Sequence, residues 1–358
     1  MLAWQSLAIV VGALLVVLSL TDVFQSVVVP RAPAGRRLRP SFYSARAAWW
    51  LWPHLSWWLH PRNPDRREDF LAIFAPFNLI LTLMLWSLLM LLGYGAIFFA
   101  MRENVRPELV TFPEAFYFAG TSFFTIGFGD YVGSSGWTRL IALAAGASGF
   151  GVISTTTAYL FAIFGAFQAR EQFVVTLGAR AGSPPSGVGF LEIAQLTKTT
   201  GSLSPIMRDA QQWAATLMET HLAYPILAYF RSSHDYESWV GTLGTLLDAS
   251  TILLSTVVDF DGEAKVFHTI GRHATHDLAR YFHLASEDRN AGVTFEEFNE
   301  ACERLERCGY TLRERREAWE RFTTLRGAYA TNLNALARFF QTPPLRWIGD
   351  RSILTLPH

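Results

Sequence analysis

The sequence predicts an all-α integral membrane protein whose second half is a helical domain outside the membrane. Three uncharged apolar stretches, residues 1–21, 70–101 and 140–169, are each long enough to cross a bilayer. Helical periodicity continues through the second half, where strand-like alternation is nearly absent. Composition agrees, because charged residues make up only 17% of the 358 residues, against about 25% in a typical soluble domain. Equal numbers of basic and acidic residues give no electrostatic footprint for nucleic acid.

The distribution of arginine predicts the orientation. Residues 30–69 carry eight Arg against three carboxylates, whereas residues 102–139 carry three Arg against four. By the positive-inside rule the first segment is cytosolic and the second external. The N-terminus is then outside, and no basic residue precedes the first apolar stretch to suggest a cleaved signal peptide. We expect a multi-pass protein of the cell (plasma or inner) membrane with a cytosolic C-terminus.

Four parts follow from these assignments: an N-terminal transmembrane helix (1–29), a cytosolic linker (30–69), a helix–loop–helix module (70–169) and a cytosolic helical domain (170–358). Within the linker, residues 47–61 hold five Trp and no charge. This segment is too short to span and is broken by Pro53, and a fourth crossing would invert the later helices against the arginine count. We interpret it as an interfacial helix in contact with membrane lipid.

The loop between the second and third apolar stretches begins like a helix. Thr111 and Glu114 have the spacing of a capping box, and Pro113 is tolerated in a first turn. Apolar residues 115–124 then give about three turns, half a bilayer thickness. The glycine-alternating strip TIGFGD, residues 125–130, follows. Membranes accept such an irregular backbone only where it is buried in protein or lines a pore.

This strip resembles the selectivity filter of potassium channels, whose common form is TVGYG. The preceding AFYFAGTSFF resembles the pore helix of the two-pore-domain potassium channels and their prokaryotic relatives. The resemblance covers about residues 70–169 and implies a re-entrant pore loop. Since the chain has one such loop, it supplies a quarter of a filter, and the implied assembly is a homotetramer with four-fold closure.

The resemblance implies passive potassium conduction, in which backbone carbonyls replace the hydration shell of K⁺. K⁺ is the only cofactor or metal expected. Gly127 and Gly129 permit the alternating φ values that keep successive carbonyls facing the axis, and Asp130 at the outer mouth raises the local cation concentration. The ion-binding residues implied are Thr125, Ile126, Gly127, Phe128 and Gly129.

Three alternatives stay open: a glycine-rich turn between membrane helices, a weakly selective cation channel, and a non-conducting membrane sensor or scaffold. Many potassium channels have a second Thr where this chain has Phe124, and some have an acid where it has Thr121. These departures bear on filter stability and inactivation more than on ion identity. The paired glycines and adjoining Asp argue against a scaffold, which has no need of them.

The third apolar stretch is expected to line the cavity below the filter. Its glycines permit either a bend or close contact with another helix, and both interpretations stay open; they are Gly146, Gly149 and Gly151. Thr155 and Tyr159, four residues apart, are predicted to share a face toward the pore. No span carries the regular arginines of a voltage sensor. We expect Asp22, near the inner end of the first stretch, to be an interfacial acid.

After a linker at residues 178–189, periodicity predicts six helices in the cytosolic domain: 190–199, 205–231, 236–258, 263–284, 294–307 and 311–340. Residues 239–258 are apolar enough for another span, but Asp248 near the centre would be costly in lipid. We therefore interpret this segment as a buried bundle or tetramer-contact helix. A Rossmann-like regulatory domain would show strands and a G-x-G-x-x-G turn, and neither is present.

None of the candidate sensor or enzyme motifs in this domain fits a known site. Four histidines, at positions 268, 273, 276 and 283, share a predicted helix without the carboxylates of a metal site, so we expect them to be solvated. Residues 288–297 are too short for a calcium loop, and the two cysteines lack zinc spacing. No enzyme motif is present, so an enzyme is not expected. The cytosolic ligand and the gating stimulus are not assigned.

Overall fold

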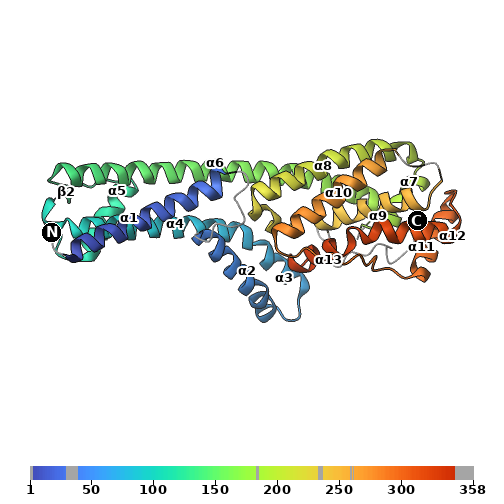
Figure 1. Cartoon of the computed structure of the whole chain (residues 1–358), viewed down its shortest axis with the longest axis horizontal. Coiled ribbons are helices and arrows are strands. Elements are labelled where there is room, and N and C mark those ends of the chain that lie inside the picture. The colour runs from blue at the N-terminus through green and yellow to red at the C-terminus, as the bar shows by residue number, and fades with distance from the viewer. Residues whose placement is uncertain are drawn as a thin grey trace. The chain divides into compact units, whose positions relative to one another are not determined.

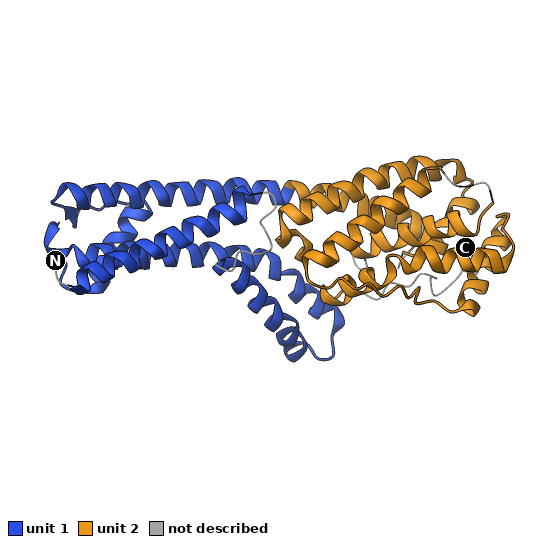
Figure 2. Ribbon diagram, viewed as in Figure 1, with its two compact units in different colours: residues 1–164 blue, residues 165–358 orange. Residues whose placement is uncertain are grey.

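The structure is a computed structural model that describes residues 3–29, 39–182, 185–232, 237–258, 260 and 262–342. The chain forms two compact units, residues 1–164 and 165–358 (Figure 2). We predicted a boundary after residue 169. The division falls inside one unbroken helix, α6 (Gly136–Ala181), which contributes residues to both units.

In its described residues, unit 1 is built of helices and one pair of two-residue strands (Figure 1). Its elements are α1 (Ala3–Val23), the π-helix η1 (Phe24–Val28), α2 (Pro40–Leu59), α3 (Pro64–Ala72), α4 (Phe74–Ala100), the 3₁₀ turn η2 (Arg102–Asn104), β1 (Val105–Arg106), α5 (Phe112–Phe123), β2 (Val132–Gly133) and the first part of α6. Strands β1 and β2 pair antiparallel. Residues 3–28, 64–100 and 136–181 are long and apolar enough to cross a membrane. The predicted all-α membrane fold is confirmed.

Helices α1 and α4 pack at very short range. A Cβ on Gly12 would lie 2.5 Å from the carbonyl oxygen of Gly93, and a Cβ on Gly93 would lie 2.8 Å from that of Gly12. A small residue on each helix is what allows two backbones to approach this closely in a membrane.

Asp22, near the end of α1, is fully buried and is not the interfacial acid we expected. Its carboxylate accepts hydrogen bonds from the Trp86 indole at 2.9 Å, and from the backbone amide and the hydroxyl of Ser41 at 2.8 and 2.7 Å. The Arg39 guanidinium lies 3.9 Å away. Burial of a carboxylate is costly without such donors. Because Ser41 belongs to α2 and Trp86 to α4, Asp22 joins three helices.

The tryptophan-rich segment forms α2, which is longer than the predicted interfacial helix and contains Pro53. One side of α2 packs on α3 and α4. Trp49 meets Phe74 edge-on at 4.8 Å between ring centroids, and Trp52 stacks on Phe70 at 4.8 Å. The other side exposes aromatic rings, at Trp50, Trp57 and Trp58. Contact of this side with lipid stays a prediction.

Unit 2 is a helical bundle. Its elements after the end of α6 are α7 (Gly187–Leu196), the 3₁₀ turn η3 (Thr200–Ser202), α8 (Leu203–Ala223), the 3₁₀ helix η4 (Pro225–Tyr229), α9 (Trp239–Ser255), α10 (Gly262–Tyr281), α11 (Phe295–Cys308), α12 (Arg315–Gly327) and α13 (Ala330–Phe339). The predicted linker is shorter than residues 178–189, because α6 continues to Ala181. The single helix predicted for residues 311–340 is wrong: it is two helices that break after Gly327, a poor helix former whose Cβ would meet the Arg289 carbonyl oxygen at 2.6 Å.

Helix α9 lies at the centre of unit 2, and every one of its residues is buried. The Asp248 carboxylate accepts a hydrogen bond from the Arg326 guanidinium at 3.0 Å and another from the Tyr329 hydroxyl. The buried charge therefore has partners from α12 and from the turn before α13. The prediction that this apolar segment is a buried bundle helix is confirmed.

We expected four solvated histidines on one helix, but they do not all face solvent, and His283 lies beyond the end of α10 at Tyr281. His273 and His283 are exposed and His276 is half-buried, but His268 is buried. Burial, together with the charge of Arg272, lowers the pKa of His268 to about 4. His268 lies on the face of α10 that packs into the bundle, which an isolated count of histidines does not reveal.

Candidate functional site

The predicted pore loop starts with α5, as the capping signal indicated. Its N-cap is Thr111, and Thr111 and Glu114 form a capping box. The Glu114 carboxylate accepts the backbone amides of Val110 at 2.6 Å and of Thr111 at 3.3 Å. These bonds satisfy amides that the first helical turn leaves without partners. The helix then ends at Phe123, directly before the glycine-alternating strip.

The backbone of the strip alternates from residue to residue. The φ angle is +57° at Thr125, +60° at Gly127 and +82° at Gly129, and neither intervening residue has a positive φ. Glycine adopts such angles without penalty. A β-branched residue at positive φ is strained, and strain of this kind persists mostly where function requires the conformation. The strip therefore has a backbone conformation with alternating positive φ angles, and one of these is at a threonine.

The C-terminal turn of α5 anchors the inner end of the strip. The Thr121 carbonyl accepts the backbone amides of Ile126 at 2.9 Å and of Gly127 at 3.2 Å. The amide and the carbonyl of a trans peptide point in opposite directions. The carbonyls of Thr125 and Ile126, which share peptide groups with those amides, therefore point away from the Thr121 carbonyl. This leaves them free to accept a cation.

The side chains of the strip lie on the surface of the single chain. Ile126 is 53% exposed and Phe128 is 69% exposed. No atom lies within 4 Å of a Cβ placed on Gly127 or Gly129. An apolar side chain at each of two alternate positions is thus uncovered.

Tyr117 of α5 connects the pore helix to the residue that follows the strip. Its hydroxyl lies near the Asp130 carboxylate and interacts with it electrostatically. Its ring also meets that of Tyr131 edge-on, with 6.2 Å between centroids. Asp130 is exposed at the C-terminal end of the strip. Tyr117 was not among the residues predicted from the sequence, where its only signal is a phenol within an apolar run.

The glycines of α6 have different surroundings. A Cβ on Gly149 would lie 1.8 Å from the carbonyl oxygen of Phe123, and a Cβ on Gly146 would lie 3.3 Å from that of Ser122. Nothing lies within 4 Å of a Cβ on Gly151. Gly146 and Gly149 therefore serve close contact with the end of α5. Gly151 makes no contact that requires glycine.

Thr155 and Tyr159 are both half-buried and follow the buried Val152 along α6. Ser154, next to Thr155, is exposed. The two predicted pore-lining residues thus have similar burial, as their four-residue spacing implies. Their facing a pore depends on other copies of the chain and stays a prediction.

Tyr94 of α4 is a further residue that our sequence analysis missed. It is buried, and its hydroxyl lies 3.1 Å from the Ser148 hydroxyl and donates to the Ala144 carbonyl at 3.3 Å. Both partners belong to α6. A polar ring and a serine in two otherwise apolar spans were the signal that could have indicated this pair.

No group of three or more His, Cys, Asp or Glu side chains in the described residues is placed to hold a metal ion. The groups suited to a cation in the pore loop are backbone carbonyls, which recognise hard monovalent ions by replacing their water.

Comparison with known proteins agrees with this geometry. Residues 86–166, which include α5, the strip and the contact region of α6, match a family model described as "Ion channel". The match supports an ion channel. The chain is also similar to the protein named "Uncharacterized membrane protein YdjJ" from Bacillus subtilis (strain 168), with 26% identity over 189 residues. This alignment covers 51% of the chain and 54% of the relative, about half of each. No solved structure matches the chain significantly.

An ion channel domain implies transport across a membrane and not catalysis. The apolar helices and the membrane-protein relative together indicate a membrane location.

Proposed function

We propose that the chain is a potassium-selective channel that assembles as a homotetramer and conducts K⁺ passively through Thr125–Gly129. The observation that carries the proposal is the alternation of φ along this strip, with positive values at Thr125, Gly127 and Gly129. Four such strips around an axis would form rings of carbonyl oxygens at successive levels.

The surroundings of the strip favour a cation. Helix α5 ends at Phe123 beside the inner end of the strip, and a helix C-terminus carries about half a negative charge. At the other end, Asp130 adds a full negative charge where ions would enter. Ile126 and Phe128, between the residues with positive φ, supply apolar side chains that would pack behind the filter and fix its diameter.

Exposure in the single chain supports assembly. Phe128 is 69% exposed and Ile126 is 53% exposed, in a segment that would lie at membrane depth. Neighbouring copies would cover these side chains and complete the carbonyl rings. One pore loop per chain then gives a tetramer as the closed arrangement.

The test is the reversal potential of the purified protein in planar bilayers, with potassium chloride on one side and sodium chloride on the other. We expect reversal near the potassium equilibrium potential. Gly127→Ala should abolish the selective current, because alanine is strained at a φ of +60°. Gly136→Ala is the matched control, since a Cβ there meets nothing within 4 Å and φ is not positive.

Other results would contradict the proposal in different ways. Reversal near zero would indicate a weakly selective cation channel, and Phe124 and Thr121 would be the first residues to change. A wild-type protein that stays silent across changes of pH, calcium, membrane tension and lipid would favour the sensor or scaffold. A measured mass of the assembly that does not correspond to four chains would exclude the tetramer.

A further inference from the structure

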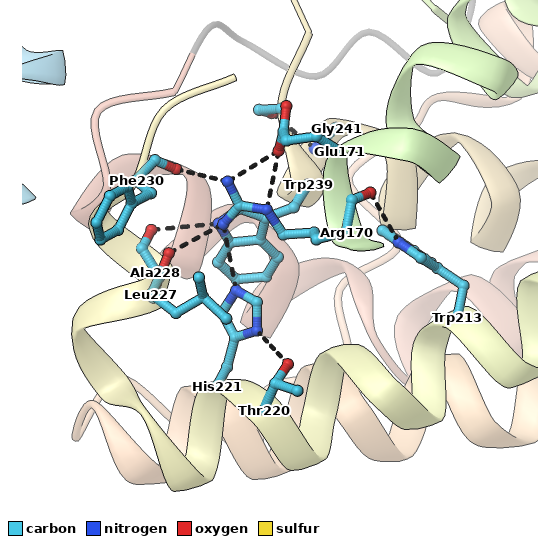
Figure 3. A network of polar contacts seen from close by, with 11 residues as sticks. Arg170, Glu171, Trp213, Thr220, His221, Leu227, Ala228, Phe230, Trp239 and Gly241 are labelled. Carbon is cyan, nitrogen blue, oxygen red and sulfur yellow. Dashed lines mark hydrogen bonds and ion pairs between the residues drawn. The ribbon is translucent and has the colours of Figure 1, made fainter. Parts of the chain in front are cut away.

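Arg170 is the first charged residue after the third apolar stretch, and it does not face solvent. It lies on α6 within unit 2, and it is only 3% exposed. Figure 3 shows its guanidinium at the centre of a network of polar groups from α6, α8 and η4. A buried guanidinium is costly unless its donors are occupied, so its partners define what holds it.

The guanidinium donates hydrogen bonds to two backbone carbonyls at the end of η4. One terminal nitrogen donates to the Leu227 carbonyl at 2.9 Å, and the other donates to the Phe230 carbonyl at 2.8 Å. Its Nε donates to the Glu171 carboxylate at 2.9 Å, which balances the charge. The planar fork of arginine can hold several acceptors in fixed directions, whereas a lysine ammonium acts as a single point charge.

Further contacts fix α6 at the same place. The Trp213 indole of α8 donates to the Arg170 carbonyl at 3.2 Å, and the Phe173 ring stacks on the Trp213 ring at 4.9 Å. One turn earlier on α6, the Phe167 ring lies 5.5 Å from the Phe230 ring. Side chain and backbone of this part of α6 are thus both bound to the α8–η4 segment.

His221 adds no second positive charge to the network. Its Nδ1 donates to the Leu217 carbonyl at 2.7 Å, which leaves Nε2 as an acceptor 3.4 Å from the Arg170 guanidinium. Full burial and the nearby arginine lower the pKa of His221 well below its usual value. The imidazole is therefore neutral, and it supports the arginine without repelling it.

The same helix continues to the filter. α6 is unbroken from Gly136 to Ala181, and its Gly149 lies against the end of the pore helix α5. A shift or rotation of η4 that is not followed by α6 would break both carbonyl bonds of Arg170, so that the buried guanidinium keeps the Glu171 carboxylate but loses its two backbone acceptors. The cost of that state links the two elements.

We propose that Arg170 is the positioning residue through which η4 holds the inner pore helix, so that a movement of η4 in the bundle changes the open probability of the pore. This rests on the proposed channel function and deepens it. Arg170 does not touch the permeating ion. It acts on gating through α6 and leaves the filter unchanged.

The experiment records single channels of the full-length protein in planar bilayers. Arg170→Gln removes the paired hydrogen bonds to the Leu227 and Phe230 carbonyls. We expect its open probability to change at least fivefold, while its unitary current and reversal potential stay as in the wild type. Arg170→Lys keeps the charge beside Glu171 but cannot hold both carbonyls, so it should shift open probability in the same direction by a smaller factor. Arg180→Gln is the control, because Arg180 is exposed on the same helix.

Thermal unfolding of each purified variant checks that it is folded. If Arg170→Gln does not fold, Arg170→Lys carries the test alone. A folded variant with wild-type open probability overturns the proposal, as does a variant that alters reversal potential and open probability together. Failure of the channel function itself is recognised separately, because it shows in the wild type as absent or unselective current; a wild type with no current overturns both.

Discussion

Gly149 of α6 lies directly against the backbone of Phe123 at the end of α5, where an added Cβ would come 1.8 Å from the carbonyl oxygen. The atom in the way belongs to backbone and not to a flexible side chain, so it cannot move aside without shifting α5. The sequence left open whether this glycine permits bending or close packing. The structure assigns it to packing.

We therefore expect Gly149→Ala to destabilise the pore region by about 1–3 kcal/mol or more, the range for overpacking a tight contact. Because α5 leads straight into the strip, selective current should also be lost. Gly151→Ala, two residues on, meets nothing within 4 Å and should gain up to about 1 kcal/mol from helix propensity. Thermal unfolding in detergent, read by size exclusion, measures both. Equal stability of the two variants would contradict the assigned contact.

Asp130 offers a prediction about conduction. If its charge concentrates cations at the outer mouth, Asp130→Asn should reduce unitary inward current roughly twofold or more at about 10 mM salt, where the Debye length is about 30 Å. The difference should vanish near 1 M salt. Glu108→Gln, an exposed acid in the same predicted external segment, should have little effect. A reduction that persists at high salt would mean that Asp130 acts through local contacts, such as its proximity to Tyr117, and not through its long-range field.

The pH dependence of stability follows from His268. The unfolded chain takes up this proton below about pH 6.5, whereas the folded protein resists it to a pKa of about 4, owing to burial and the charge of Arg272, against a hydrogen bond to Leu325. The unfolded state therefore binds more protons in this window, and stability falls as the pH decreases from about 6.5 toward 4. The full effect is on the order of 3 kcal/mol.

In His268→Gln, stability should fall less steeply as the pH decreases. Thermal unfolding of the full-length protein between pH 7.5 and 5 measures this. His221, which is also buried with a lowered pKa, should still contribute to the loss of stability at low pH. His276→Gln on the same helix is only a control, because that ring is partly exposed. If the stability of His268→Gln depends on pH as that of the wild type does, His268 is not the group responsible.

The two sides of α2 permit a test of lipid contact. Trp58 is 77% exposed, whereas Trp49 is packed against Phe74. In bilayers with brominated lipid, the wild type should lose tryptophan emission, and Trp58→Phe should remove a quenchable fraction that Trp49→Phe leaves intact. Trp50, which is 69% exposed, should behave like Trp58. Equal quenching in all variants would place the exposed side of α2 against protein.

The elements that the sequence predicted well are those with a local signal. Apolar stretches placed α1, α4 and α6, because span length depends on consecutive residues alone. The spacing of Thr111 and Glu114 placed the start of α5, because capping is complete within one turn. Gly127 and Gly129 indicated the special backbone of the strip. The positive φ of Thr125 was not foreseen, since its cause is the fold and not its own residue type.

What the sequence did not reveal depends on partners far along the chain. Ser41 and Trp86, which donate to Asp22, lie 19 and 64 residues away, and the carbonyls held by Arg170 lie 57 and 60 residues away. Spacing along a helix carries no information about such pairs. For the same reason His268 looked like its exposed neighbours, although tertiary packing buries it.

The position of Asp22 has a consequence for biosynthesis. The carboxylate leaves the ribosome before any of its donors, and Trp86 is made only when 64 more residues have been added. Until Ser41 and Trp86 have both been made, the carboxylate near the end of α1 lacks these donors, and a charge without its partners is disfavoured in hydrocarbon. We therefore expect the end of α1 that carries Asp22 to stay in water or at the headgroups during this time. It can reach its final depth only after α2 and α4 have emerged, so the three helices settle in the bilayer together and not one by one.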